Sequence, residues 1–183
     1  MRMNRHNTCL LGVMAVGLGG SFIATSEAWS QQKQSVSYSI PSGAARYTQE
    51  HLIDVGDVPG HQVRVFEIHT DYQNINVSFA GVKVKEAWVR GASDYTNGTG
   101  TAANYTLWIL EDGNKLFARD AVVGHASVAA DGSKALKYSS VNTFTGGTGK
   151  FRGIRGQLRA NSVRVPGAKT ITTDIVGEYW IEE

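Results

Sequence analysis

The chain has 183 residues, with 18 lysines and arginines against 16 aspartates and glutamates, and a formal net charge of +2. This near balance excludes the strongly basic character of nucleic-acid-binding proteins and of proteins that coat anionic membranes. The one cysteine, Cys9, excludes a fold held by internal disulfides, so stability must come from packing.

The first thirty residues have the pattern of an export signal. Arg2 and Arg5 precede an apolar stretch, Cys9–Ala24, and Ala28 and Ser30 are small residues at the positions that a signal peptidase reads. We expect cleavage after residue 30 and an exported protein, periplasmic or secreted, with no membrane contact afterwards. A retained membrane anchor is the alternative, but the apolar stretch is shorter than the ~20 residues of a spanning helix and contains four glycines. Cleavage removes two cations and one anion, which leaves a formal charge of +1.

The remainder has the pattern of an all-β protein. Residues 31–40 are expected to form a flexible leader, because Gln31–Ser37 is polar and featureless. Beyond it, short alternating runs rich in Val, Ile, Tyr, Phe and Trp are separated by glycine-bearing turns, and no run keeps a helical period. The sequence predicts one domain over residues 41–183 with eight strands: His61–Tyr72, Asn76–Phe79, Val82–Arg90, Asn104–Leu110, Lys115–Gly124, Lys137–Phe144, Lys150–Ala160 and Thr170–Glu182.

The connections are predicted from turn residues. Glu111–Asn114 contains Asp-Gly, which supplies the positive φ angles of a tight hairpin, and Ala130–Ser133 is a second turn signal. Gly91–Ala103 is small and polar, so we expect a long loop or a mobile lid there. Eight strands without covering helices favour a closed antiparallel barrel or a sandwich, and a barrel of this size encloses one small ligand.

The stretch Phe144–Arg159 resembles a phosphate-binding loop but lacks the required spacing. A P-loop needs Ser or Thr after Gly-Lys, whereas Gly149-Lys150 is followed by Phe151. A dinucleotide fingerprint fails too, since the glycine spacing differs and no amphipathic helix follows. The glycines then serve a turn at Gly146-Gly147 and bend the next strand. Two interpretations of its cations stay open, a solvated row or a clamp for a ligand anion: Arg152, Arg155 and Arg159.

The same stretch resembles a signature of two plant families. Gly-Gly-Thr-Gly-Lys-Phe-Arg is similar to a motif of dirigent proteins, and the run from Gly146 to Gln157 is similar to the corresponding stretch of allene oxide cyclases. The two families share an eight-stranded antiparallel β-barrel. The resemblance implies that barrel, a hydrophobic cavity and a homo-oligomer, trimer or dimer. It carries over no catalytic residue, because the families' acid, base and pocket residues lie outside the motif.

Side-chain alternation supplies candidate site residues. In Val82–Arg90, Glu86 and Trp88 share parity with Val82 and Val84, which predicts that they face a cavity. In His61–Tyr72, Glu67, His69 and Asp71 share one face, either inward or as a hydrated outer surface. The candidate catalytic residues are Glu67, His69 and Glu86, and the candidate ligand-binding residues are Trp88, Tyr105, Tyr179 and Arg119.

These residues suit general acid–base chemistry on a confined ligand. The expected function is to bind a small hydrophobic or aromatic molecule and to direct its cyclisation, isomerisation or stereoselective coupling. A non-catalytic ligand-binding or envelope interaction module is the alternative, since similar barrels serve both. No cofactor and no metal are expected, because the histidines are scattered and none stands at ligand spacing from another.

Overall fold

The computed structural model describes residues 32–128, 132, 134–164 and 171–182, which belong to one compact unit. The predicted export signal lies outside the described residues, as does most of the predicted turn Ala130–Ser133. The elements are β1 (Gln34–Ile40), β2 (Ala45–Asp54), β3 (His61–Asp71), β4 (Ser78–Phe79), β5 (Val82–Thr96), β6 (Thr99–Leu110), β7 (Lys115–Val128), β8 (Lys134–Gly147), the 3-10 helix η1 (Gly149–Phe151), β9 (Ile154–Arg164) and β10 (Thr172–Ile181).

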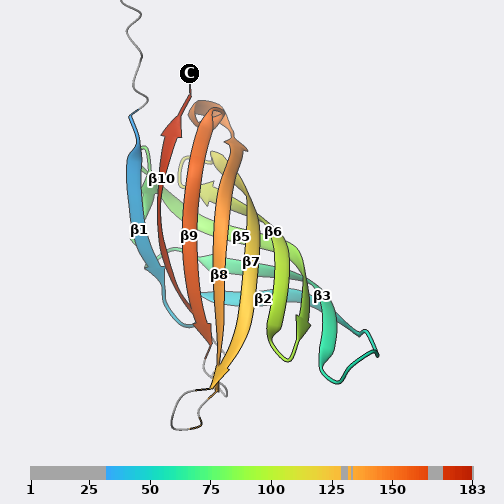
Figure 1. Ribbon diagram of the computed structural model, residues 1–183. Helices are drawn as coiled ribbons and strands as arrows, with labels where there is room; N and C mark the ends of the chain where they lie inside the picture. Colours follow the sequence, from blue (N-terminus) through green and yellow to red (C-terminus); the bar gives the residue numbers. More distant parts are fainter. Residues whose placement is uncertain (1–31, 129–131, 133, 165–170, 183) are drawn as a thin grey trace, which may run out of the picture. The chain divides into compact units, whose positions relative to one another are not determined.

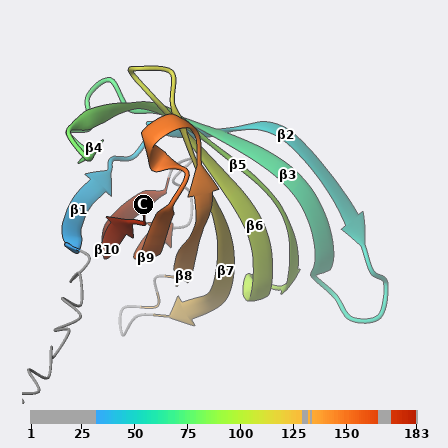
Figure 2. The same ribbon diagram turned by 90° about the horizontal axis from the view of Figure 1, so that it is seen from above.

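Nine strands form one curled antiparallel sheet. Their order is β1-β10-β9-β8-β7-β6-β5-β3-β2, and β4 pairs with β5 outside this path. The sheet curls so that β2, β3 and β5 pass behind β8–β10 and cross them (Figure 1), and the view from above shows the arch from β10 to β2 (Figure 2). The prediction of an all-β, antiparallel fold is confirmed. The closed eight-stranded barrel is not, because the described part of the chain has ten strands and no pairing between β1 and β2.

The strand β1 replaces the expected leader. It pairs with β10 residue for residue, from Gln34 opposite Tyr179 to Ile40 opposite Thr173. The reason is visible in its alternation, since Val36 and Tyr38 face the core while the intervening serines face away.

The expected loop Gly91–Ala103 is a hairpin instead. β5 and β6 continue through it to a turn at Asn97 and Gly98, whose φ angles of 51° and 85° are those of a two-residue hairpin turn. Small residues are needed where the strands approach closely: a Cβ on Gly100 would lie 2.0 Å from the Asp94 carbonyl oxygen. The predicted hairpin at Asp112-Gly113 is present, with the Leu110 amide donating to the Asn114 carbonyl over 2.9 Å.

The glycine-rich stretch forms a connection between β8 and β9. β8 ends at Gly147, η1 follows, and β9 begins at Ile154, so the expected strand starts four residues later than predicted. Phe151 in η1 is fully buried. A Cβ on Gly153 would lie 2.0 Å from the Glu182 carbonyl oxygen, so this glycine permits close backbone approach.

An aromatic cluster fills one end of the curl. Phe79, which is fully buried, comes from the short strand β4 and contacts rings from three other strands. Its ring centroid lies 5.1 Å from Tyr179, 5.7 Å from Phe144 and 6.3 Å from Trp108. Leu110, Leu116, Ile154 and Leu158 are further members of this core.

Replacing Phe79 with alanine should open a cavity in the core that its neighbours cannot fill. We expect the free energy of unfolding to fall by about 3–5 kcal/mol, measured by urea denaturation. The control is Val123→Ala on an exposed position of β7, where we expect a change within about 0.5 kcal/mol. Equal effects of the two substitutions would contradict this account of the core.

A histidine joins two hairpins at the other end of the sheet. His61 Nδ1 lies 2.6 Å from Asp57 Oδ1, and its Nε2 lies 2.8 Å from Asp94 Oδ1 in β5. The hydrogen bond to Asp94, followed by that to Asp57, raises the pKa of His61. Protonated His61 thus bridges two carboxylates from different hairpins.

This bridge predicts a pH-dependent stability. Because the folded state raises the pKa of His61, its stabilisation is fully present below the ordinary histidine value and is lost as pH rises through the folded value. His61→Gln should therefore lower the melting temperature more at about pH 5.5 than at about pH 9, measured by circular dichroism. A loss that is the same at both pH values would exclude a charged bridge.

Candidate functional site

The sheet has two faces with different environments. We call the face that carries Leu116 and Ala118 the inner face, because both side chains are buried in the core, and the opposite one the outer face. An extra residue in β5, Lys85, reverses the alternation there: Val84 pairs with Leu110, whereas Glu86 pairs with Ile109. Val84 therefore lies on the inner face and Glu86 on the outer face.

The outer face brings together six of the seven residues proposed from the sequence. Glu67, Arg90, Tyr105 and Arg119 are successive cross-strand neighbours from β3 to β7, and His69 is opposite Trp88. The prediction that Glu86 and Trp88 face a cavity is wrong, because the bulge at Lys85 places both side chains on the outer face. The six are Glu67, His69, Glu86, Trp88, Tyr105 and Arg119.

Five side chains form a connected polar and aromatic network. His69 Nε2 lies 2.8 Å from Glu86 Oε2, and the His69 ring lies 4.5 Å from the Trp88 ring. The Arg90 guanidinium lies 5.3 Å from the same indole, and Arg90 Nε donates to Glu67 Oε2 over 2.7 Å. The network contains a histidine oriented by a carboxylate, which is the arrangement of a general base.

Glu67 is held as a carboxylate. Thr48, itself an extra residue between the paired positions of β2, donates to Glu67 Oε1 over 2.6 Å. This hydrogen bond, assisted by Arg90, lowers the pKa of Glu67. Since each carboxylate oxygen accepts from a protein donor, Glu67 is suited to positioning Arg90 rather than to donating a proton.

Tyr105 and Arg119 present a stacked pair to the solvent. The Arg119 guanidinium lies 5.4 Å from the Tyr105 ring centroid and donates to the Tyr105 hydroxyl over 3.3 Å. Tyr105 is 60% exposed. The two side chains flank an open groove of about 500 Å³ that crosses β6, β7 and β8.

Tyr179, the seventh residue, belongs to the core. Its ring packs on Phe79, and its hydroxyl accepts from the Ala80 amide and donates to Gln34 Oε1, both over 2.6 Å. Burial raises the pKa of this phenol. The sequence correctly indicated its inward direction, but its hydroxyl is already bonded within the protein.

The inner face holds a buried acid that is not among the seven residues proposed from the sequence. Asp120 on β7 is 5% exposed, and Thr106 Oγ1 donates to its Oδ2 over 2.5 Å. Burial raises the pKa of Asp120, against hydrogen bonds from Asn142 and Thr106. Asp120 shares parity with Leu116, a signal of its inward direction that the sequence offered.

Three polar atoms on neighbouring inner positions have no partner within the described residues. They are Asp120 Oδ1, Asn104 Oδ1 and Ser93 Oγ, all buried. Asn104 is directly opposite Asp120, and Ser93 lies one inward position along β5 from Gly91, the residue opposite Asn104. A Cβ on Gly91 would lie 2.1 Å from Asn104 Oδ1, so the amide lies over this glycine. Buried polar atoms normally have hydrogen-bond partners, so these three mark a place where a bound molecule or water would supply them.

Two tyrosines lie farther along the same face. The rings of Tyr95 on β5 and Tyr138 on β8 are 5.9 Å apart and meet edge to face. They cover Gly124 on β7, where a Cβ would lie 2.9 Å from both rings. Burial raises the pKa of Tyr95 to about 12, so both its ring and its protonated hydroxyl are available to the inner face.

No group of three or more His, Cys, Asp or Glu side chains in the described ranges is arranged to hold a metal ion. The same ranges contain no helix long and apolar enough to span a membrane.

No protein-family model, no curated protein and no solved structure matches the chain.

Asp120→Asn should alter how stability depends on pH. Because burial raises the pKa of Asp120, ionisation destabilises the folded state as pH rises from its ordinary value through the folded one. The asparagine variant cannot ionise, so its stability relative to the parent should increase as pH rises above the ordinary aspartate pKa of about 4, measured by urea unfolding. A difference that does not change with pH would contradict burial of the acid.

Proposed function

We propose that the protein binds a small hydrophobic or aromatic molecule with an oxygen substituent inside the curl of its sheet and directs its cyclisation, isomerisation or stereoselective coupling. The observation that carries the proposal is the set of three unpartnered buried atoms of Ser93, Asn104 and Asp120. A buried polar atom without a partner costs about 1–3 kcal/mol, so a ligand oxygen that hydrogen-bonds to them would bind favourably. The rings of Tyr95 and Tyr138 lie on the same face and would contact the remainder of such a ligand.

Asp120 is the acid of the proposed reaction. Its raised pKa favours the protonated form, which donates a hydrogen bond or a proton to a ligand oxygen. Thr106 fixes the carboxyl group through Oδ2, and confinement selects one ligand conformer, which lowers the entropic part of the barrier. In this proposal the outer residues Glu67, His69 and Glu86 take no direct part.

The resemblance of residues 146–157 to dirigent proteins and allene oxide cyclases supports the proposal. It would make the curled sheet a counterpart of their eight-stranded barrel, with the ligand on its inner face. The export signal expected in residues 1–30 would place the activity in the periplasm or outside the cell. A homo-oligomer belongs to the same proposal.

Ligand binding is tested with the neutral fluorescent probe N-phenyl-1-naphthylamine. We expect stoichiometric binding with energy transfer from the buried Trp108, which Trp88→Phe on the outer face leaves unchanged. Asn104→Leu removes a polar partner of the ligand oxygen and should weaken an oxygen-bearing naphthol more than the naphthylamine. Absence of stoichiometric binding would contradict the proposal.

Catalysis is tested by turnover of candidate polyenes and phenolics. Asp120→Asn should keep ligand binding and reduce turnover by roughly 10²-fold or more, because it removes the acid but preserves shape. The matched controls are Glu67→Gln and Glu86→Gln, which should retain turnover. If only the control variants lost turnover, the catalytic residues would lie on the outer face. If the parent protein bound ligand without any turnover, it would be a carrier.

A further inference from the structure

Two neighbouring rows of side chains run across the outer face, perpendicular to the strands. The apolar row consists of cross-strand neighbours on β5 to β8: Ala92, Ala103, Ala121 and Val141. The polar row lies beside it on β5 to β9: Arg90, Tyr105, Arg119, Thr143 and Gln157. The two rows exist because the five strands from β5 to β9 pair in this register.

The apolar row forms the floor of a groove. The alanines of the apolar row have shorter side chains than the residues of the polar row, so the outer face is hollow above them. One hollow of about 710 Å³ lies over β2 to β6, and a second of about 500 Å³ lies over β6 to β8. The two hollows share Ala103 and Tyr105, and the second shares Thr143 with a hollow of about 650 Å³ over β8 to β10. With neighbouring strands about 4.8 Å apart, the length from β5 to β9 is about 19 Å.

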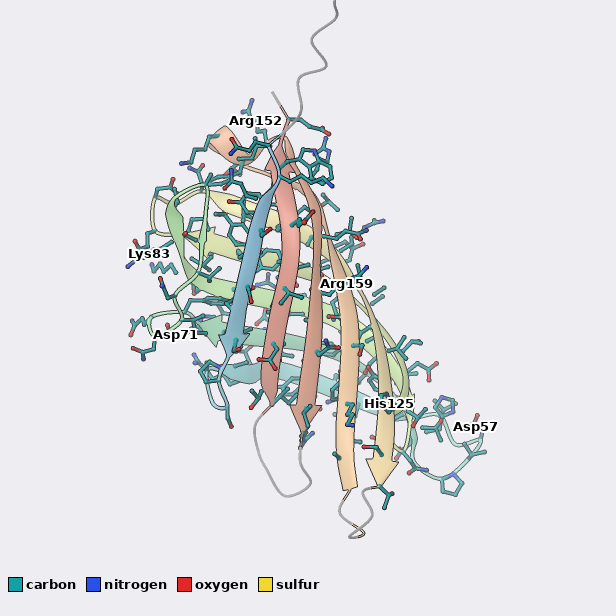
Figure 3. The ribbon with its side chains drawn as sticks, turned by 60° about the vertical axis from the view of Figure 1, so that its left-hand side comes forward. Asp57, Asp71, Lys83, His125, Arg152 and Arg159 are labelled. Atoms are coloured by element: carbon teal, nitrogen blue, oxygen red, sulfur yellow. The ribbon has the colours of Figure 1, made fainter. Side chains whose placement is uncertain are left out.

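The unpaired charges along this groove are positive. Arg90 is neutralised by Glu67 at 2.7 Å. Arg119 stacks on Tyr105, and Arg159 lies midway along β9 beside Val141 (Figure 3). Neither of the last two arginines has a carboxylate within ion-pair distance in the part of the chain that the structure describes.

We propose that this groove binds a linear acidic polysaccharide. Tyr105 offers an exposed ring on which the apolar face of a sugar stacks. The Gln157 amide donates to Thr143 Oγ1 over 3.3 Å, which leaves the Gln157 carbonyl oxygen and the Thr143 hydroxyl proton for sugar hydroxyls. Arg119 and Arg159 bind carboxylates, which suits the fork of a guanidinium. The groove runs across the strands, so a bound chain contacts side chains and does not extend the sheet by backbone pairing.

A polysaccharide fits the charge of the groove better than a nucleic acid does. Residues 31–183 carry a formal charge of only +1, and acidic residues flank the polar row, Glu67 on β3 opposite Arg90 and Glu178 on β10 opposite Gln157. Nucleic acid carries about one charge per 1.7 Å of duplex and requires a denser basic surface. A polyuronate carries one carboxylate per sugar unit, a wider spacing than that of duplex phosphates, so two unpaired arginines along the groove suit it.

The test is calorimetric titration of the full-length protein with polygalacturonate and with the same polymer fully methyl-esterified. We expect the protein to bind the acid form. Its affinity for the ester should be lower by roughly tenfold or more, since esterification removes the partner of each guanidinium. Arg119→Gln and Arg159→Gln should each weaken binding of the acid form roughly fivefold or more. Ala121→Leu should abolish it by filling the floor.

The matched control is Lys83→Gln, an equal charge change on β5 away from Arg159 in the same view (Figure 3), which should bind as the parent does. Circular dichroism verifies folding of each variant. No binding, equal binding of acid and ester, or parental binding by the Arg119, Arg159 and Ala121 variants would overturn the proposal. Tighter binding of single-stranded oligodeoxythymidylate than of polygalacturonate would overturn it in favour of a nucleic acid site.

Discussion

The packing of Phe79 against Trp108, Phe144 and Tyr179 is the interaction on which the remaining structure depends. Phe79 comes from β4, which lies outside the nine-strand path and pairs only with β5. Its ring lies between side chains from β6, β8 and β10, so it holds parts of the curled sheet that share no backbone hydrogen bonds. The curl in turn encloses the inner face, and that enclosure desolvates Asp120 and its unpartnered neighbours.

The two faces solve the same problem of polar side chains in different ways. On the outer face, Glu67 and Glu86 have protein partners at 2.6–2.8 Å, whereas the buried Nδ1 of His69 has no partner within the described residues. On the inner face, buried oxygen atoms on neighbouring strands lack such partners. Natural proteins seldom leave buried polar atoms unpaired without compensation, and sites for ligands are where such departures concentrate. The grouping of three such atoms on neighbouring inner positions therefore supports the inner face as a site.

Alternation predicted most strands, but β1, β2 and the hairpin ends of β5 and β6 were missed, and side-chain direction was wrong where pairing is irregular. The valine and aromatic runs of β3, β7 and β10 were recognisable, as was the Asp112-Gly113 turn. Lys85 and Thr48 could not be identified as extra residues, because a bulge is set by backbone pairing with a neighbour and leaves no hydrophobic signal. One extra residue moves every later side chain to the other face, which is why Glu86 and Trp88 were expected inside. Asp120 lies on a strand without an extra residue, so alternation alone predicts that its side chain faces inward.

The pairing of β1 with β10 brings the two ends of the described chain together. Ser39 Oγ donates to Asp174 over 2.6 Å, and Gln34 accepts from Tyr179, although each pair is separated by more than 130 residues. Such long-range contacts form late and slow the folding of β proteins. β10 is synthesised more than 130 residues after β1, so β1 has no native partner while the strands between them are made. Until β10 is available, β1 stays an unpaired edge accessible to chaperones.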